Sequence, residues 1–154
     1  MKGELVSIHV CESAGKEMTE IQEAELVAGI GIVGDRYSSA TGTFSEQLPG
    51  PDHELTLVAA EEVARFSESL GRDLGPGELR RNLVTRGIEL NDLVDREFTI
   101  GKARARGIRL CEPCAYLARL VGPEVLPALL HRAGLRATIV ENGTIRPGDC
   151  IETL

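Results

Sequence analysis

The sequence predicts a mainly β protein, a closed or nearly closed barrel with two to three peripheral helices on its outside and ends. Three observations favour this class: seven or eight short strand-like segments, two or three helical segments, and no regular alternation of strand with helix. Regular alternation is typical of a doubly wound sheet, so a barrel fits better. Because 154 residues is an ordinary domain length, we expect one domain spanning residues 1–154.

The amino-terminal half begins with strand signals and contains one clear helix. Residues 4–10, ELVSIHV, alternate and include β-branched side chains, which predicts a strand, and residues 54–58, ELTLV, predict another. Residues 18–29 fit a helix or a strand. In AAEEVARFSESLGR, residues 59–72, Val63, Phe66 and Leu70 recur at helical spacing, so we predict a helix that stops at Gly71.

Two segments between these elements have the composition of turns and loops. GIGIVGDRY, residues 29–37, contains three glycines in nine residues, which predicts a tight turn with exposed backbone. Residues 37–52 are rich in Ser, Thr, Gly and Pro, and they are the best candidate for a long mobile loop. Long loops in compact domains are often functional.

The carboxyl-terminal half predicts more strands and two shorter helices. The predicted strands cover residues 82–88, 97–101 and 103–110. A helix should start near Pro113, and another should cover EVLPALLHRAG, residues 124–134, closed by Gly134. The last twenty residues predict a hairpin, because Asn142-Gly143 between two strand-like runs is a strong turn signal.

Charge and hydropathy exclude several classes of partner. A net charge of -7 and a pI near 5.0 argue against nucleic-acid binding, which needs a basic face. Arginines in residues 80–86 and 102–109 can still attract a small anion. We find no signal-peptide pattern and no run of roughly 18 apolar residues, so we expect no membrane association and a cytoplasmic location. Cysteines there are normally reduced.

RLCEPCAYLARL, residues 109–120, places Cys111 and Cys114 three positions apart and admits three interpretations. Cys114 in the first turn of a helix would be a reactive thiol, because helix N–H dipoles favour the thiolate; alternatively it is a small buried apolar residue. The CxxC spacing also suits a redox pair, although such a pair normally lies early in a βαβ unit. Zinc is not expected, because only one close-spaced cysteine pair exists.

Two arginine-containing segments are candidates for anion binding. In ELRRNLVTRGI, Arg80 and Arg81 precede Asn82 at a strand start, where planar donors can hold a phosphate and the amide can contact a nearby polar group. A solvated turn is the alternative. In GDRY, Asp35 and Arg36 form a local ion pair, or the arginine faces an anionic ligand.

Four segments, in this order, resemble the MOSC domain, a family named for its place at the carboxyl end of molybdenum-cofactor sulfurases. They are GDRY (34–37), PGELRRNLVTRGIELNDL (76–93), FTIGKARARGIRLCEPCAYL (98–117) and GLRATIVENGTIRPGD (134–149). The resemblance implies a closed barrel similar to the pyruvate-kinase barrel. It also implies binding of a molybdenum–pterin cofactor, or transport of sulfur as a cysteine persulfide.

The resemblance assigns roles to individual residues. The family cysteine, a sulfur carrier or molybdenum ligand, corresponds to Cys114, whereas relatives often have arginine at the position of Cys111. Arg81 and Asn82 correspond to a segment near the cofactor site, and Asp35 and Arg36 to a second one. We therefore expect these residues, with Arg80, to hold the cofactor.

Three functions remain open at this stage. The first is a small stand-alone MOSC protein, an oxidoreductase or a sulfur-transfer protein, that uses Cys114. Because the chain has no desulfurase domain, a cysteine desulfurase or a molybdenum-cofactor biosynthesis protein would act in trans. The second is a dithiol redox protein in which Cys111 is the resolving thiol. The third is a non-catalytic binding module on the same barrel.

Overall fold

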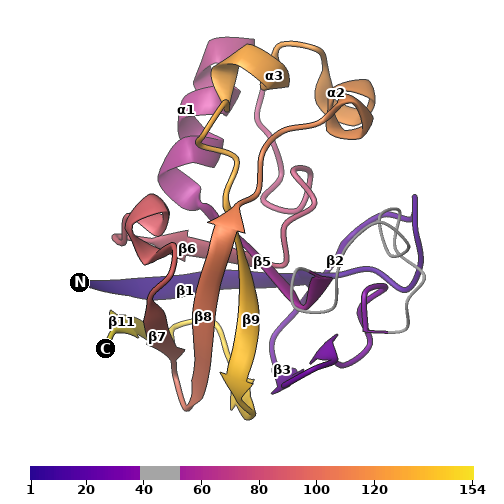
Figure 1. The fold of residues 1–154 in the computed structure, drawn as a ribbon. Coiled ribbons are helices and arrows are strands. Elements are labelled where there is room, and N and C mark those ends of the chain that lie inside the picture. The colour runs from indigo at the N-terminus through magenta and orange to yellow at the C-terminus, as the bar shows by residue number, and fades with distance from the viewer. Residues whose placement is uncertain (39–52) are drawn as a thin grey trace.

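Seven strands close into a barrel in the computed structural model, which describes residues 1–38 and 53–154. Around the barrel the order is β11-β7-β8-β9-β5-β6-β1, and β1 pairs with β11 to close it (Figure 1). The barrel strands are β1 (Lys2–Val10), β5 (Leu55–Ala59), β6 (Leu83–Arg86), β7 (Glu97–Ile100), β8 (Ala103–Leu110), β9 (Leu135–Glu141) and β11 (Cys150–Thr153). The predicted mainly β barrel is confirmed.

The barrel is antiparallel at every pairing but one. β5 and β6 run parallel, and α1 (Ala60–Leu70) forms the connection between them. Two parallel neighbouring strands need such a crossover connection, because a tight hairpin can join only antiparallel strands. α1 ends as predicted: Gly71 is the C-cap, with a φ of 68° in the left-handed region.

A small second sheet lies beside the barrel in the described part of the chain. Its order is β10 (Gly143–Ile145), β3 (Ala24–Val27) and β4 (Gly31–Ile32). The ambiguous residues 18–29 form two strands, β3 and β2 (Thr19–Ile21), of which β2 pairs with β1. The loop predicted over residues 37–52 falls, beyond Ser38, outside the described residues.

Buried Glu54 fastens the β3–β4 turn to the barrel. Its carboxylate accepts hydrogen bonds from Gly29 N at 2.8 Å, from Ile139 N at 3.4 Å and from the hydroxyl of Thr138. One carboxylate thus ties the segment before β4 to β9, and this fixes the chain that leads to Asp35.

Apolar side chains form two cores, one on each face of the barrel wall. Leu57 and Leu83 point into the barrel, where an aliphatic cluster with Phe98 fills the interior. Val58 and Val84, the next residues along the same strands, point outward and pack beneath the helices. Since both faces of the wall are buried here, each strand carries two consecutive apolar residues, Leu57-Val58 and Leu83-Val84, that face opposite sides.

Three α-helices and one 3-10 helix lie outside the barrel in the described segments. They are α1, α2 (Ala115–Val121), α3 (Val125–Ala128) and the 3-10 helix η2 (Leu90–Leu93). Figure 1 shows α1, α2 and α3 gathered over one end of the barrel. Phe66 of α1, Leu117 of α2 and Val125 of α3 share the outer core, so this end of the barrel is closed by packed side chains.

The helix predicted over residues 124–134 is wrong in length, because α3 comprises only Val125–Ala128. His131 has a φ of 61°, which no α-helix allows. Glu112 accepts hydrogen bonds from the His131 backbone N at 2.7 Å and from its ring Nδ1 at 2.5 Å, and Asn91 Nδ2 donates to its carbonyl at 2.9 Å. Tertiary contacts therefore override the local helical pattern.

The predicted carboxyl-terminal hairpin is also wrong. β9 pairs with β5 and β8, whereas β10 pairs with β3 in the small sheet. A two-residue hairpin turn at Asn142-Gly143 needs positive φ at both residues, and neither has it. Asn142 Oδ1 instead accepts a hydrogen bond from Ala28 N at 2.8 Å, and Gly143 passes against the backbone of Ala103.

Candidate arginine and cysteine site

A small cavity lies where the helical cap meets the barrel, and five chain segments line it. Its volume is about 30 Å³. The lining residues come from the turn after β4, from β5, from the segment before β6, from α2 and from β9, and they are Arg36, Tyr37, Thr56, Arg80, Arg81, Cys114, Tyr116, Leu117 and Arg136. Segments far apart in sequence therefore meet here only because the barrel brings them together.

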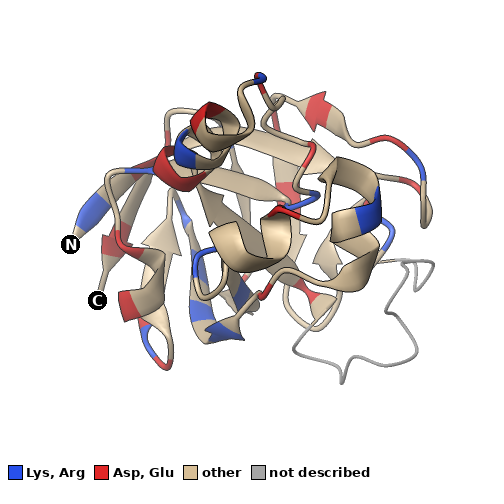
Figure 2. Ribbon diagram, turned by 90° about the horizontal axis from the view of Figure 1, so that it is seen from above, with Lys and Arg blue, Asp and Glu red and all other residues tan. Residues whose placement is uncertain are grey.

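The charge of this cavity is opposite to that of the chain. Four of its lining residues are arginines, and none of the described lining residues is acidic, whereas the whole chain has a net charge of -7. Figure 2 shows acidic and basic residues spread over both the strands and the helices. Since the field of several guanidinium groups attracts anions, the cavity is suited to an anionic ligand.

Asp35 and Arg36 form a buried ion pair at the edge of the cavity. Arg36 Nη1 lies 3.2 Å from Asp35 Oδ1, and the Asp35 carboxylate also accepts from the backbone N of Cys11 and of Tyr37. The Arg36 guanidinium lies over the Tyr37 ring, 4.6 Å from its centre. Asp35 does not line the cavity; it holds the turn and the arginine that do.

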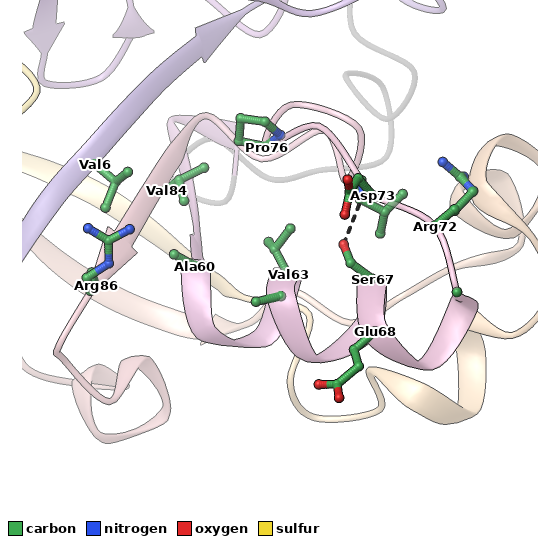
Figure 3. Close-up of a pocket in the computed structure, with 13 residues that line it drawn as sticks. Val6, Ala60, Val63, Ser67, Glu68, Arg72, Asp73, Pro76, Val84 and Arg86 are labelled. Atoms are coloured by element: carbon green, nitrogen blue, oxygen red, sulfur yellow. Dashed lines mark hydrogen bonds between the residues drawn. The ribbon is translucent and has the colours of Figure 1, made fainter.

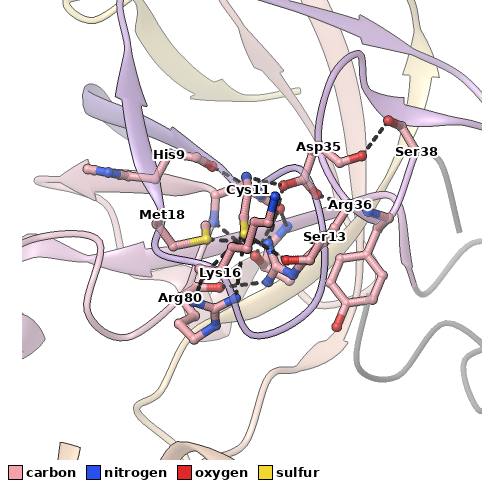
Figure 4. Close-up of polar contacts among 12 residues, drawn as sticks. His9, Cys11, Ser13, Lys16, Met18, Asp35, Arg36, Ser38 and Arg80 are labelled. Carbon is pink, nitrogen blue, oxygen red and sulfur yellow. Dashed lines mark hydrogen bonds and ion pairs between the residues drawn. The ribbon is translucent and has the colours of Figure 1, made fainter. Parts of the chain in front are cut away.

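Arg80 has an unusual backbone conformation. Its φ of 61° lies in the left-handed region, which is rare for a side chain of this size. Arg80 Nη1 donates to the carbonyl oxygen of Lys16 at 2.7 Å, and its own carbonyl accepts from Arg36 Nη2 at 3.4 Å (Figure 4). Two arginines of the cavity are thus joined to each other through a backbone group.

Arg81 uses its guanidinium to connect three backbone segments. It is only 8% exposed. It donates to the carbonyl oxygens of Ala133 at 2.8 Å, Leu79 at 3.2 Å and Cys111 at 3.1 Å. These bonds engage the planar donors that the sequence suggested for a phosphate. Arg81 lines the cavity, but its observed contacts are structural.

Asn82 is likewise a structural residue in its observed contacts. Its amide donates to the carbonyl oxygen of His9 at 3.1 Å, and its Oδ1 accepts from the backbone N and the hydroxyl of Thr56, at 3.3 Å and 3.1 Å. Both ends of the amide therefore bind neighbouring barrel strands. Asn82 fixes β1 and β5 around the start of β6 and does not line the cavity.

The two cysteines of CEPC have different surroundings. Cys114 is half-buried and lines the cavity, whereas Cys111 is only 2% exposed and does not. The sequence predicted Cys114 in the first turn of a helix. α2 begins at Ala115, so Cys114 is instead its N-cap residue. Its side chain makes no capping hydrogen bond. All four cysteines carry free thiols.

The sequence did not single out several polar residues of the cavity, among them Arg136 of β9 and Tyr116 of α2. Arg136 alternates with buried Leu135 and Ala137, a pattern that normally indicates a solvent-facing side chain. α2 covers that face, and this burial cannot be read from periodicity. Arg136 and Tyr116 each lie inside a segment that resembles the MOSC domain, and this resemblance was the signal that could have marked them as site residues.

A larger groove of about 700 Å³ lies elsewhere, between α1, β1 and β6. Figure 3 shows Val6, Val63 and Val84 in its wall, with Arg86 at one end and Arg72 and Asp73 at the other. None of the described residues that line the groove is a cysteine or a histidine. Its size exceeds that of the arginine-lined cavity, but Glu68 and Asp73 line it together with Arg72 and Arg86, so it has no excess of one charge.

Two general features of the structure concern metals and membranes. Among residues 1–38 and 53–154, no three His, Cys, Asp or Glu side chains converge closely enough to hold a metal ion. Cys114 is the one soft ligand among the described residues of the cavity wall. None of the helices in the same described segments has the length and apolar composition that crossing a bilayer requires.

Comparison with known proteins identifies similar sequences and folds. The family model of the MOSC domain matches residues 45–152. The YuaD protein from Bacillus subtilis has a similar fold, with a TM-score of 0.81 and 17% identity, over 99% of this chain and 96% of that chain. YiiM from Geobacillus stearothermophilus has a TM-score of 0.75 and 18% identity, over 99% of this chain and 75% of that chain. YiiM from Escherichia coli has a TM-score of 0.71 and 16% identity, over 100% of this chain and 70% of that chain. No curated protein sequence matched significantly.

Proposed function

Since this chain belongs to the MOSC domain family, we propose that its arginine-lined cavity binds the anionic end of a molybdenum–pterin cofactor beside Cys114. In this proposal the Cys114 thiolate either ligates molybdenum or carries a sulfane sulfur. The observation that carries the proposal is the shared cavity: four arginines and one half-buried thiol line the same small space. Guanidinium groups bind oxyanions, and a thiolate is a soft ligand for a metal ion.

The size and the donors of the cavity fit the charged end of such a ligand. A volume of about 30 Å³ holds two or three groups the size of a water molecule, since one water needs about 10–15 Å³. A whole pterin does not fit into that volume. Arg36, Arg80 and Arg136 would therefore contact a phosphate or oxo group, and the remainder of the cofactor would lie outside the enclosed space.

Arg81 and Asn82 contribute indirectly in this proposal. Their side chains hold the backbone of Cys111 and of Thr56 by the bonds described above, so they determine where Cys114 and the cavity wall lie. Because a binding site gains affinity from groups that are fixed before the ligand arrives, such supports favour anion binding without touching the anion.

The chemistry at Cys114 is that of a thiolate. As a sulfur acceptor, the Cys114 thiolate attacks the outer sulfur of a donor persulfide; a new S–S bond forms on Cys114, the donor S–S bond breaks, and the donor leaves as a thiolate with no net oxidation. A cysteine desulfurase acting in trans, or a molybdenum-cofactor biosynthesis protein, would supply that persulfide. A molybdenum–pterin cofactor, when bound, would supply a redox-active metal.

Elemental and mass analysis of the native protein tests the proposal. Protein purified from a cofactor-replete host should contain molybdenum and pterin, or a mass increase of one sulfur atom on the peptide that contains Cys114. Cys114→Ser should lose the sulfur adduct or the metal. Cys150→Ser is the matched control, because Cys150 is exposed on β11, outside the cavity, and it should behave like wild type.

Two outcomes would contradict the proposal. If Cys114→Ser retained molybdenum and accepted persulfide sulfur as well as wild type, Cys114 would have neither role. If mild oxidation removed two hydrogens reversibly from the peptide containing Cys111 and Cys114, and neither molybdenum nor persulfide were found, a dithiol switch would be the better interpretation. Absence of all of these signals would favour a non-catalytic binding module.

A further inference from the structure

We propose that Cys11 is a positioning residue for the anion site, because its thiol shapes the turn that holds Arg80 at the cavity. The inference rests on the proposed function in one respect, that Arg80 contacts the bound anion. Cys11 itself does not line the cavity. It follows β1 directly and is only 2% exposed, so it acts through its neighbours and not on the ligand.

The Cys11 thiol organises the turn over residues 11–16. Sγ lies 2.9 Å from the carbonyl oxygen of Ser13 and 3.2 Å from that of Lys16, so its S–H is shared between two backbone acceptors. The Lys16 backbone N donates to the Ser13 carbonyl at 3.3 Å. The turn therefore closes around the sulfur, and the Lys16 carbonyl is directed toward the arginines (Figure 4).

Arg80 is held by this turn at two points. Its Nη1 donates to the Lys16 carbonyl at 2.7 Å, and its Nη2 approaches Cys11 Sγ at 3.9 Å. The sulfur thus touches one end of the guanidinium and orients the carbonyl that binds the other end. A planar guanidinium held at two nitrogens has its direction fixed, which a single contact does not achieve.

The backbone of Arg80 explains why such support is needed. A left-handed conformation of a non-glycine residue costs free energy and persists only where surrounding contacts impose it. The φ of Arg80 is 61°. Its backbone N donates to the Gly77 carbonyl at 3.0 Å, and its contacts to Lys16, Cys11 and Arg36 also hold the residue in place. Loss of the thiol removes one of these contacts and loosens another, so the guanidinium should lose its fixed position.

Affinity for inorganic molybdate tests the inference in a double-mutant cycle. Calorimetry at one fixed ionic strength would compare wild type, Cys11→Ala, Arg80→Ala and the double variant, with Cys150→Ala as a control for loss of a thiol. Arg80→Ala should weaken binding about 10-fold to 100-fold, the range of one charge-assisted hydrogen bond. Cys11→Ala should weaken it about twofold to tenfold in the wild-type background and should have no effect in the Arg80→Ala background.

A conservative variant separates positioning from general destabilisation. Cys11→Ser keeps a donor for the Ser13 and Lys16 carbonyls, so it should keep most of the affinity. If Cys11→Ala does not fold, Cys11→Val takes its place in the cycle, because valine keeps a buried side chain at this position but has no donor for the two carbonyls. Equal molybdate affinities for Cys11→Ser and Cys11→Val would overturn the inference.

The outcomes also distinguish this inference from the proposed function. Wild-type affinity in Cys11→Ala, with weakened binding in Arg80→Ala, would overturn the role of Cys11 alone. An equal loss from Cys11→Ala with and without Arg80 would show that Cys11 acts by another route and would also overturn it. If the wild-type protein bound no molybdate, both the anion site and the positioning role would be refuted.

Discussion

Replacing Arg81 by methionine is expected to destabilise the fold by about 3 kcal/mol, because it leaves three backbone carbonyls without their donor. Hydrogen bonds from charged groups contribute about 1.5–3 kcal/mol each. Their sum is an upper limit, since the variant also avoids the cost of burying a cation. In a domain of this length, about 3 kcal/mol corresponds to a fall in Tm of about 6–12 °C.

Urea unfolding of wild type and Arg81→Met would measure this loss as a lower midpoint with an unchanged m-value. Arg106→Met is the matched control, because Arg106 is exposed and its ion pair with Asp95 is 3.9 Å long. Surface pairs of this kind contribute about 0–1 kcal/mol. Equal urea midpoints for Arg81→Met and Arg106→Met would refute a structural role for Arg81 and would favour a direct role in ligand binding.

Two further predictions concern pH and backbone space. Burial lowers the pKa of His9 from its ordinary 6.5, and the negative charge of Glu20 opposes the shift. The folded protein therefore binds fewer protons than the unfolded chain, and its stability should fall as the pH drops below about 6.5. His9→Gln should reduce this pH dependence of the unfolding free energy between about pH 7 and about pH 5.5, and equal slopes for wild type and variant would contradict the prediction. Gly134→Ala should lower the free energy of unfolding by at least about 2 kcal/mol more than Gly148→Ala. Both glycines have positive φ, but only at position 134 would a Cβ overlap a backbone oxygen, that of Leu57. Similar Tm values for the two variants would contradict this prediction.

The barrel could be predicted because local pattern and tertiary structure agree over most strands. β8 covers Ala103–Leu110, as its alternating residues indicated, and Gly71 ends α1. The two failures share a cause, which is a contact between distant segments. Gly143 is required where the chain passes Ala103, and Glu112 holds the chain at His131. Neither contact leaves a trace in local periodicity.

The candidate site could be predicted as a set of residues but not as a division of roles. Arg36, Arg80, Arg81 and Cys114 do line one cavity. The sequence could not show that both ends of the Asn82 amide are used in hydrogen bonds within the barrel, because the partners lie on β1 and β5, which are distant in sequence.

Closure of the barrel has a consequence for the order of folding during synthesis. β1 is made before β11, yet Lys2 pairs with Glu152 on β11. Until β11 has left the ribosome, residues 2–4 of β1 lack this partner and can pair with a strand of another molecule. The large sequence separation of this pairing also predicts slow folding, since the entropy of closing so long a loop is lost before the contact forms. Expression at lower temperature, or in the presence of a chaperone that shields β1, should therefore raise the yield of folded protein.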